Sequence, residues 1–332
     1  MGLWQLRLAM VGTLGFIIAV STLFFMGLML YVGGLSLFAL VGIVVVFNVV
    51  QWLFAPRLIN ALYRVKTISK NDNPKLYGIV ERLAARSRIK MPQVGIANLP
   101  IPNAFAYGSP LTGPRVAVTS ELLKGLENEE VEAVIGHELG HLKHRDVQIM
   151  MFASVLPAIF YFIGYSLLLS AMFGAGYRRG GGGGGAPIVI GALALAVYFV
   201  LSLFVLYLSR LREYYADRHS ASVVDDGARK LSEGLAKIVV HTGRYRKLTR
   251  QRGDARLSNF RTLFISDPSR AEDDVKGFSR VGSFRGLSDQ QLVQEIASKK
   301  LTALDRFMEL FSSHPNAVKR LKTLQKIKYR ME

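Results

Sequence analysis

The sequence contains no cysteine. Structural disulfides and thiolate zinc sites are therefore excluded, and any metal must be held by histidine, carboxylates, backbone carbonyls or water. Acidic residues are also scarce, because 24 Asp and Glu stand against 42 Lys and Arg, which gives a formal net charge of +18. Half of the residues are nevertheless hydrophobic. A chain that is both this apolar and this basic indicates membrane spans from which charge is excluded.

Charged residues are missing altogether from three long stretches. The first is Leu8–Pro56, which the pair Gly33-Gly34 divides, the second separates Asp146 from Arg178, and the third runs from Gly180 to Ser209. Their apolar segments are near the ~20 residues that cross a bilayer, and the six glycines at 180–185 predict a flexible turn. A signal peptide is the alternative for the first segment, but the core of such a peptide is shorter. Four transmembrane helices are expected, at about Leu8–Val32, Leu35–Phe54, Val147–Phe173 and Pro187–Ser209.

The distribution of basic residues gives the orientation. They begin at Arg57, directly after the second expected span, and by the positive-inside rule that side is the cytoplasm. Four spans then place both termini on the cytoplasmic side of a multi-pass protein of the cell membrane. The predicted parts are 1–56 with two spans, 57–146 in the cytoplasm, 147–209 as a membrane hairpin and 210–332 in the cytoplasm.

A metal-binding pattern lies near the end of the first cytoplasmic part. Asn128 is expected to cap a helix whose apolar residues recur every three or four positions. On that helix His137 and His141 are one turn apart and face the same way, so they can hold one metal ion. Glu138 stands beside them, where a carboxylate can take a proton from a water that the metal polarises. A surface helix with two histidines is the alternative, and a third ligand would decide against it.

The membrane topology supplies a candidate for that third ligand. The expected hairpin returns the chain to the same face of the membrane just before Glu213 and Asp217, which are four residues apart and hence on one helical face. Two histidines, one glutamate and one open position form a catalytic rather than a structural zinc site. Asp217 can accept a hydrogen bond from the far ring nitrogen of a ligand histidine. A charge pair between Glu213 and a neighbouring arginine is the alternative.

The rest of the cytoplasmic chain predicts a small sheet with several helices. An amphipathic helix is expected at 73–86, further helix at 228–240, and a basic amphipathic helix near the end. Proline and glycine around the extended segments favour at least one exposed edge strand. The basic segment 241–284 is expected to be a solvated loop, with contact to anionic lipid as the alternative. The expected extended segments are 92–97, 100–108 and 115–119.

Four segments carry a resemblance that spans nearly the whole chain. They are Asn103–Ala106, His137–His141, Lys143–Asp146 and Glu213–Asp217, with the hairpin between the two metal motifs. In this order they resemble the HtpX-type integral-membrane zinc metalloproteases, in the wider group that includes the zinc-dependent CAAX prenyl proteases. The resemblance implies an endopeptidase of membrane-protein quality control at the cytoplasmic face.

The resemblance also implies roles for residues outside the metal motifs. One segment is implied to be an edge strand that pairs with the substrate backbone. His314, in a His-Pro element, is implied to stabilise the tetrahedral intermediate, and Arg320 follows it as a residue beside the substrate. The alternative for His314 is a polar residue before a proline at the first position of a helix. The residues implied for the edge strand are Asn103, Ala104, Phe105 and Ala106.

Together, the predictions describe an α-helical membrane protein with four transmembrane helices and an α+β zincin-like catalytic domain. One zinc ion per chain is expected on His137, His141 and Glu213, although this ligand set tolerates other divalent ions. The expected partners are membrane-protein or peptide substrates and the lipid bilayer. Nucleic acid is not expected, and a homo-oligomer is left open. The alternatives are a CAAX-type prenyl protease and a non-enzymatic membrane adaptor with a basic cytoplasmic domain.

Overall fold

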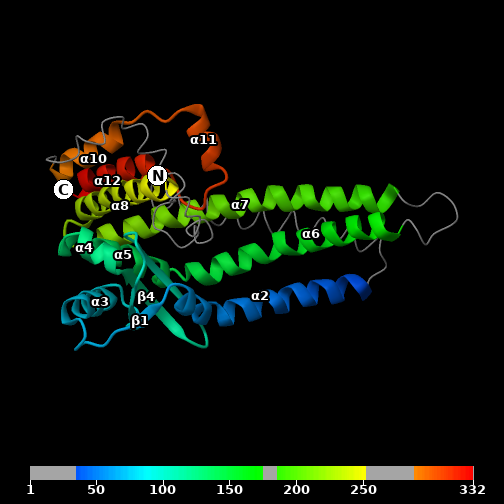
Figure 1. The fold of residues 1–332 in the computed structure, drawn as a ribbon, viewed down its shortest axis with the longest axis horizontal. Helices are drawn as coiled ribbons and strands as arrows, with labels where there is room; N and C mark the ends of the chain where they lie inside the picture. The colour runs from blue at the N-terminus through cyan, green and yellow to red at the C-terminus, as the bar shows by residue number, and fades with distance from the viewer. Residues whose placement is uncertain (1–34, 175–184, 252–287, 332) are drawn as a thin grey trace. The chain divides into compact units, whose positions relative to one another are not determined.

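The structure, a computed structural model, describes residues 35–174, 185–251 and 288–331 (Figure 1). These residues divide into two compact units. The first unit contains residues 35–53, 148–174 and 185–211, and the second contains residues 54–147, 212–251 and 288–331. Three expectations lie outside the described residues: the span at Leu8–Val32, the glycine turn at 180–184, and the basic segment from 252 to 284.

Three helices of the described chain are long and apolar enough to cross a membrane. They are α2 (Leu35–Leu62), α6 (Asp146–Gly174) and α7 (Gly185–Val223), and they contain the second, third and fourth expected spans. Helices form here because a helix satisfies every backbone polar group within its own segment. The helix that contains the second expected span continues beyond Phe54, through Pro56 to Leu62. A proline inside a helix removes one hydrogen bond and can kink the helix without ending it.

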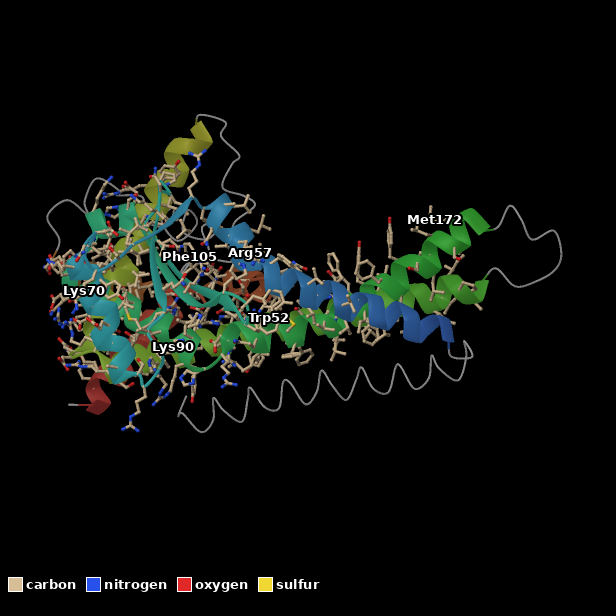
Figure 2. All side chains as sticks on the ribbon, turned by 90° about the horizontal axis from the view of Figure 1, so that it is seen from below. Trp52, Arg57, Lys70, Lys90, Phe105 and Met172 are labelled. Atoms are coloured by element: carbon tan, nitrogen blue, oxygen red, sulfur yellow. The ribbon has the colours of Figure 1, made fainter. Side chains whose placement is uncertain are left out.

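The helices of the first unit pack through small and aliphatic side chains. Gly164 and Gly191 let α6 and α7 approach closely, since a Cβ on Gly164 would lie 2.9 Å from the carbonyl oxygen of Gly191. Arg210 is the one charged residue in the described part of this unit, and the side chains along these helices in Figure 2 are accordingly almost all carbon. Among the described residues, one buried cluster of these helices consists of Val44, Ile159, Ile163 and Ala194, and another of Phe160 and Leu201.

The second unit contains a small mixed sheet, as expected. Its strands are β1 (Val65–Thr67), β2 (Gln93–Ala97), β3 (Ala104–Ser109) and β4 (Gly113–Thr119). Their order across the sheet is β1-β2-β4-β3, with β2 and β4 parallel and the other pairs antiparallel. β1 is not predicted by the pattern because three residues are too few to show alternation. β3 is at the edge of the sheet, where Ala104 pairs with Val118 of its inner neighbour.

Helix α5, which carries the His-Glu-x-x-His pattern, lies in the core of the second unit. Val134, Ile135 and Leu139 are fully buried in contact with α3, α8 and the sheet, and Figure 1 shows α5 between the sheet and α8. The expected helix at 73–86 is α3, which Asn73 caps by accepting a hydrogen bond from the Leu76 N–H at 3.0 Å. The helices of this unit are α3 (Pro74–Arg86), α4 (Ser120–Gly125), α5 (Asn128–Lys143), α8 (Gly227–Gln251), α10 (Asp289–Ser298), α11 (Ala303–Glu309) and α12 (Ala317–Met331).

Two local expectations are wrong. Glu127, and not Asn128, is the N-cap of α5, and its backbone N–H donates a hydrogen bond to Oε2 of Glu130 at 2.8 Å. Acidic side chains suit this end of a helix because of the helix dipole. In addition, α8 runs to Gln251, so the first residues of the basic segment are helix and not loop. Thr242 is only 3% exposed, which shows that tertiary burial overrides the polar composition there.

Candidate active site

The two histidines of α5 approach each other through their far ring nitrogens. Nε2 of His137 lies 3.2 Å from Nε2 of His141, and the two rings stand edge to face. This geometry follows from the helix, because side chains four residues apart lie one above the other on one face. Both Nε2 atoms are therefore available to the same ion.

Helix α7 brings a carboxylate to the same point. Oε2 of Glu213 lies 3.5 Å from Nε2 of His137, and Oε1 lies 3.5 Å from Nε2 of His141. Donor atoms bound tetrahedrally to zinc at about 2.0–2.1 Å would be about 3.3 Å apart. The separations of 3.2 to 3.5 Å in this cluster match that value. Two imidazoles and one carboxylate are also a donor set that zinc prefers, so the residues present fit such an ion.

Close packing of α5 on α7 makes this arrangement possible. A Cβ on Gly140 would lie 3.1 Å from the Cα of Ala216, and a Cβ on Gly136 would lie 3.1 Å from Oγ of Ser220. The Ser220 hydroxyl also donates a hydrogen bond at 2.6 Å to the carbonyl oxygen of Ala133. The distance from the imidazoles to the carboxylate therefore depends on the missing side chain at these glycines.

Replacing Gly140 by alanine should weaken metal binding by about 10–100-fold, the usual cost of changes around metal ligands. The backbone of α7 must give by a few tenths of an ångström, whereas ligand distances tolerate about 0.2 Å. Chelator competition measures the affinity. Gly78→Ala in α3 is the matched control, because its Cβ would meet nothing within 4 Å; it should stabilise the helix by about 1 kcal/mol. Equal metal affinity in the two variants would argue against the spacing role.

A carboxylate and an arginine stand behind His137. Nδ1 of His137 lies 2.9 Å from Oδ1 of Asp217. Arg320 of α12 binds both oxygens of Asp217, through Nη2 at 2.6 Å and Nε at 3.0 Å. Nη1 of Arg320 also lies 3.0 Å from Oε2 of Glu213. Arg320 is 1% exposed, so one buried guanidinium offsets two buried carboxylates.

A second carboxylate–arginine pair stands behind His141. Nδ1 of His141 lies 2.7 Å from Oδ2 of Asp146, while Arg212 binds the other oxygen of Asp146 and donates to the carbonyl oxygen of His144 at 2.8 Å. The sequence pattern assigns these two residues no role. Helical spacing cannot reveal the contact, because α5 ends first and Arg145, with a φ of 55°, turns the chain back. The available signal is an aspartate five residues after the second histidine.

The charges around the two histidines favour one positive charge between them. Burial lowers the pKa of His137, but the carboxylates of Asp217 and Glu213 outweigh burial and raise that pKa to about 9. Burial and the nearby His137 lower the pKa of His141. On Arg320, burial is likewise outweighed by Asp217 and Glu213, which raise its pKa. The buried carboxylates thus stabilise a cation at the meeting point of the rings.

Two further polar residues are buried at this site. Glu138 is 3% exposed and directly follows the first histidine in α5. His314 lies before α12, with Nδ1 at 3.1 Å from Oε1 of Glu213, and its Nε2 is buried without a hydrogen-bond partner in the described chain. His144, which follows the metal-binding pattern in the sequence, does not join this cluster, because its ring packs on the ring of Tyr215. The site therefore gathers His137, Glu138, His141, Glu213, Asp217, His314 and Arg320.

The residues expected to form the substrate-binding edge strand lie at β3 and not in the metal cluster, whereas Arg320 lies in the cluster. Ala104–Ala106 belong to β3, and the backbone N–H of Asn103 donates a hydrogen bond at 2.9 Å to Oγ1 of Thr119. Phe105, labelled in Figure 2, is 3% exposed and packs against Tyr63 at 5.3 Å between ring centroids. The Phe105 side chain therefore belongs to the core, which leaves the backbone of this edge strand for contact with a peptide.

Fold and site together define a class, the membrane metallopeptidases: apolar helices are joined to a domain in which a His-Glu-x-x-His helix and a distant glutamate gather metal-binding atoms. The family model described as peptidase family M48 matches residues 70–328. A "Protease HtpX homolog" of Thermoplasma acidophilum is 37% identical over 95% of this chain and 93% of its own length. The chain belongs to peptidase family M48 and is an HtpX-type protease.

Other comparisons agree with this assignment. A "Protease HtpX homolog" of Archaeoglobus fulgidus is 33% identical over 98% of this chain and 88% of its own length. Among solved structures, the crystal structure of S. mikatae Ste24p is similar with a TM-score of 0.51 at 16% identity. The match covers 93% of this chain and 66% of that chain. At this identity the likeness concerns the fold alone.

Proposed function

We propose that the protein is a zinc-dependent endopeptidase that cleaves misfolded or damaged membrane proteins on the cytoplasmic side of the cell membrane. The observation that carries the proposal is the cluster of His137, His141 and Glu213, whose donor atoms have the spacing of a zinc site. The basic residues after the second span support the cytoplasmic orientation. The choice of membrane-protein substrates rests on the resemblance that the sequence motifs carry and on the apolar helices of the chain itself.

The two imidazoles and the Glu213 carboxylate would hold the zinc ion. When bound, zinc supplies a Lewis acid that polarises oxygen atoms in an open coordination position. Asp217 and Asp146 would fix the orientation and tautomer of the two rings, because each lies within 3 Å of an Nδ1 atom. The ring nitrogens that face the ion are then free of protons.

Glu138 is assigned the role of general base. Its carboxylate accepts a proton from the attacking water and later passes that proton to the amine that leaves. A buried position beside both histidines suits this role, because a general base must be within hydrogen-bond reach of the proton it takes.

His314 is assigned the role of oxyanion donor. Its contact with Glu213 places it at the site, and its buried Nε2 has no hydrogen-bond partner among the described residues. A buried donor of this kind costs free energy unless something binds it, and a developing oxyanion is such a group. Arg320 contacts Asp217 and Glu213, so we assign it a positioning role instead of the expected contact with substrate.

The substrate would be held by its backbone. β3 is an edge strand of the sheet and packs beside α5. An extended peptide can add to such an edge through main-chain hydrogen bonds, which depend little on the peptide sequence. This mode suits a protease that acts on damaged proteins of many sequences.

The test is metal content and cleavage of the full chain purified in detergent, with casein, a membrane protein and a prenylated C-terminal peptide as substrates. We expect about one zinc per chain, cleavage of the first two substrates, loss of cleavage on chelation and its return with zinc. Glu213→Gln should bind little metal and be inactive. A folded chain that binds no metal would refute the proposal. Cleavage of the prenylated peptide alone would replace it with a prenyl protease.

A further inference from the structure

Helix α11 presents its apolar side chains outward. Leu304, Phe307 and Met308 recur at intervals of three and four along one side of α11, and Phe311 continues this spacing in the turn that follows the helix. Such a stripe normally faces a core, yet these side chains are 68%, 56%, 51% and 45% exposed. We call this stripe, defined by these four residues, the outer face of α11.

The inner side of α11 is held by a charged residue. Glu309 is 6% exposed, accepts a hydrogen bond at 3.1 Å from the backbone N–H of Asn316, and is bound by Lys319. The orientation of the helix is thereby fixed by a buried carboxylate. Among the described residues, the outer face therefore points away from the core of the second unit.

The charges around the outer face are mainly positive. Lys300 and Arg306 are exposed, while the acidic Asp305 is used within the helix start, where its carboxylate accepts hydrogen bonds from the N–H and hydroxyl of Thr302 at 2.8 Å. An apolar helix face with basic residues around it is the composition of helices that lie in the interface of an anionic membrane.

We propose that the outer face of α11 docks on the surface of a bilayer that contains anionic phospholipid. The apolar side chains enter the boundary between headgroups and acyl chains, and Lys300 and Arg306 contact lipid phosphates. Charge complementarity favours an anionic bilayer as the binding partner, because its surface attracts the basic residues. Its acyl chains can also accommodate apolar side chains without a groove of matching shape. The chain has its own membrane helices, so a bilayer is always present.

Docking of α11 would influence the active site through a short series of contacts. Glu309 at the end of α11 binds Asn316 and Lys319. These two residues lie in the chain between His314, which contacts Glu213, and Arg320, which contacts Asp217. A bilayer that holds α11 therefore also restrains the position of His314. This step rests on the proposed function, whereas the docking itself does not.

The absence of cysteine makes a site-specific test direct. Met308→Cys, labelled with a fluorescent probe, reports on the outer face, and Glu295→Cys on the exposed side of α10 is the matched control. The full chain is reconstituted as single copies in nanodiscs with anionic or zwitterionic lipid. Quenching by brominated lipid reports contact with acyl chains, and quenching by iodide reports contact with water. A cooperative thermal unfolding transition like that of the unlabelled chain shows that each variant is folded.

In anionic discs we expect the label at position 308 to be quenched by brominated lipid and shielded from iodide, with the reverse at position 295. Lys300→Gln with Arg306→Gln should shift the equilibrium between docked and released α11 about 30-fold toward release, since each basic residue near an anionic surface contributes about fivefold. Free access of iodide to position 308 would overturn the proposal. Shielding of position 308 from both quenchers would also overturn it, because another part of the protein would then cover the outer face. Equal quenching by brominated lipid in anionic and zwitterionic discs would overturn it as well.

Discussion

Replacing Glu138 by glutamine should lower kcat for peptide cleavage by about 10²–10⁴-fold, the usual contribution of a general base, while the metal stays bound. Glutamine has the same shape as glutamate but cannot accept the proton of the attacking water. The metal contacts of His137, His141 and Glu213 do not involve Glu138, so metal content should equal that of the wild type. Steady-state kinetics beside metal analysis measures both quantities.

A matched control comes from the same helix. Glu129 lies in the first turn of α5 and its side chain is 42% exposed. Glu129→Gln makes the same chemical change far along the helix and should leave kcat within a factor of about two, since exposed ion pairs contribute little. If Glu138→Gln retained wild-type activity with metal bound, another group would have to serve as the base.

Replacing Arg320 by methionine should lower the free energy of unfolding by about 3–5 kcal/mol, the cost of removing one partner from a buried ionic network. The change leaves the carboxylates of Asp217 and Glu213 in the protein interior without their guanidinium. Each kcal/mol corresponds to about 2–4 °C in Tm for a domain of this size. Thermal unfolding in detergent, with and without added zinc, measures the effect.

Lys322→Met is the control for this change. Lys322 is on the same helix, α12, and is exposed, so an equal loss of basic charge should shift Tm by little. Asp217→Asn combined with Arg320→Met should be more stable than Arg320→Met alone, because one of the two uncompensated carboxylates is then removed. A Tm for Arg320→Met equal to that of Lys322→Met would show that the network carries no stability.

Much of the fold could be predicted because its signals are local. The apolar runs that form α6 and α7 depend only on their own composition, and the helical spacing of His137 with His141 depends only on α5. The proximity of Glu213 needs one further step, which the membrane hairpin provides. In the described chain, strands β2, β3 and β4 and the three apolar helices α2, α6 and α7 follow from such local patterns, whereas β1 does not.

What could not be predicted depends on tertiary contacts. The pairing of Asp146 with His141 requires the turn at Arg145, and residue spacing does not predict the φ of 55° at that turn. The helical start of the basic segment depends on burial of residues such as Thr242 against the core. In α11 the apolar side faces outward, although the apolar side of a helix usually faces the core. The buried carboxylate of Glu309 determines which side of this helix faces inward.

The order in which the chain is made gives the Arg320 network a further meaning. Asp217 and Arg320 are separated by 103 residues, so a ribosome completes both histidines, Glu213 and Asp217 long before it adds the arginine that neutralises the acids. Until α12 emerges, the growing chain has two acidic groups that cannot be buried favourably together. A half-made chain therefore lacks the guanidinium that balances Asp217 and Glu213 until α12 has been synthesised.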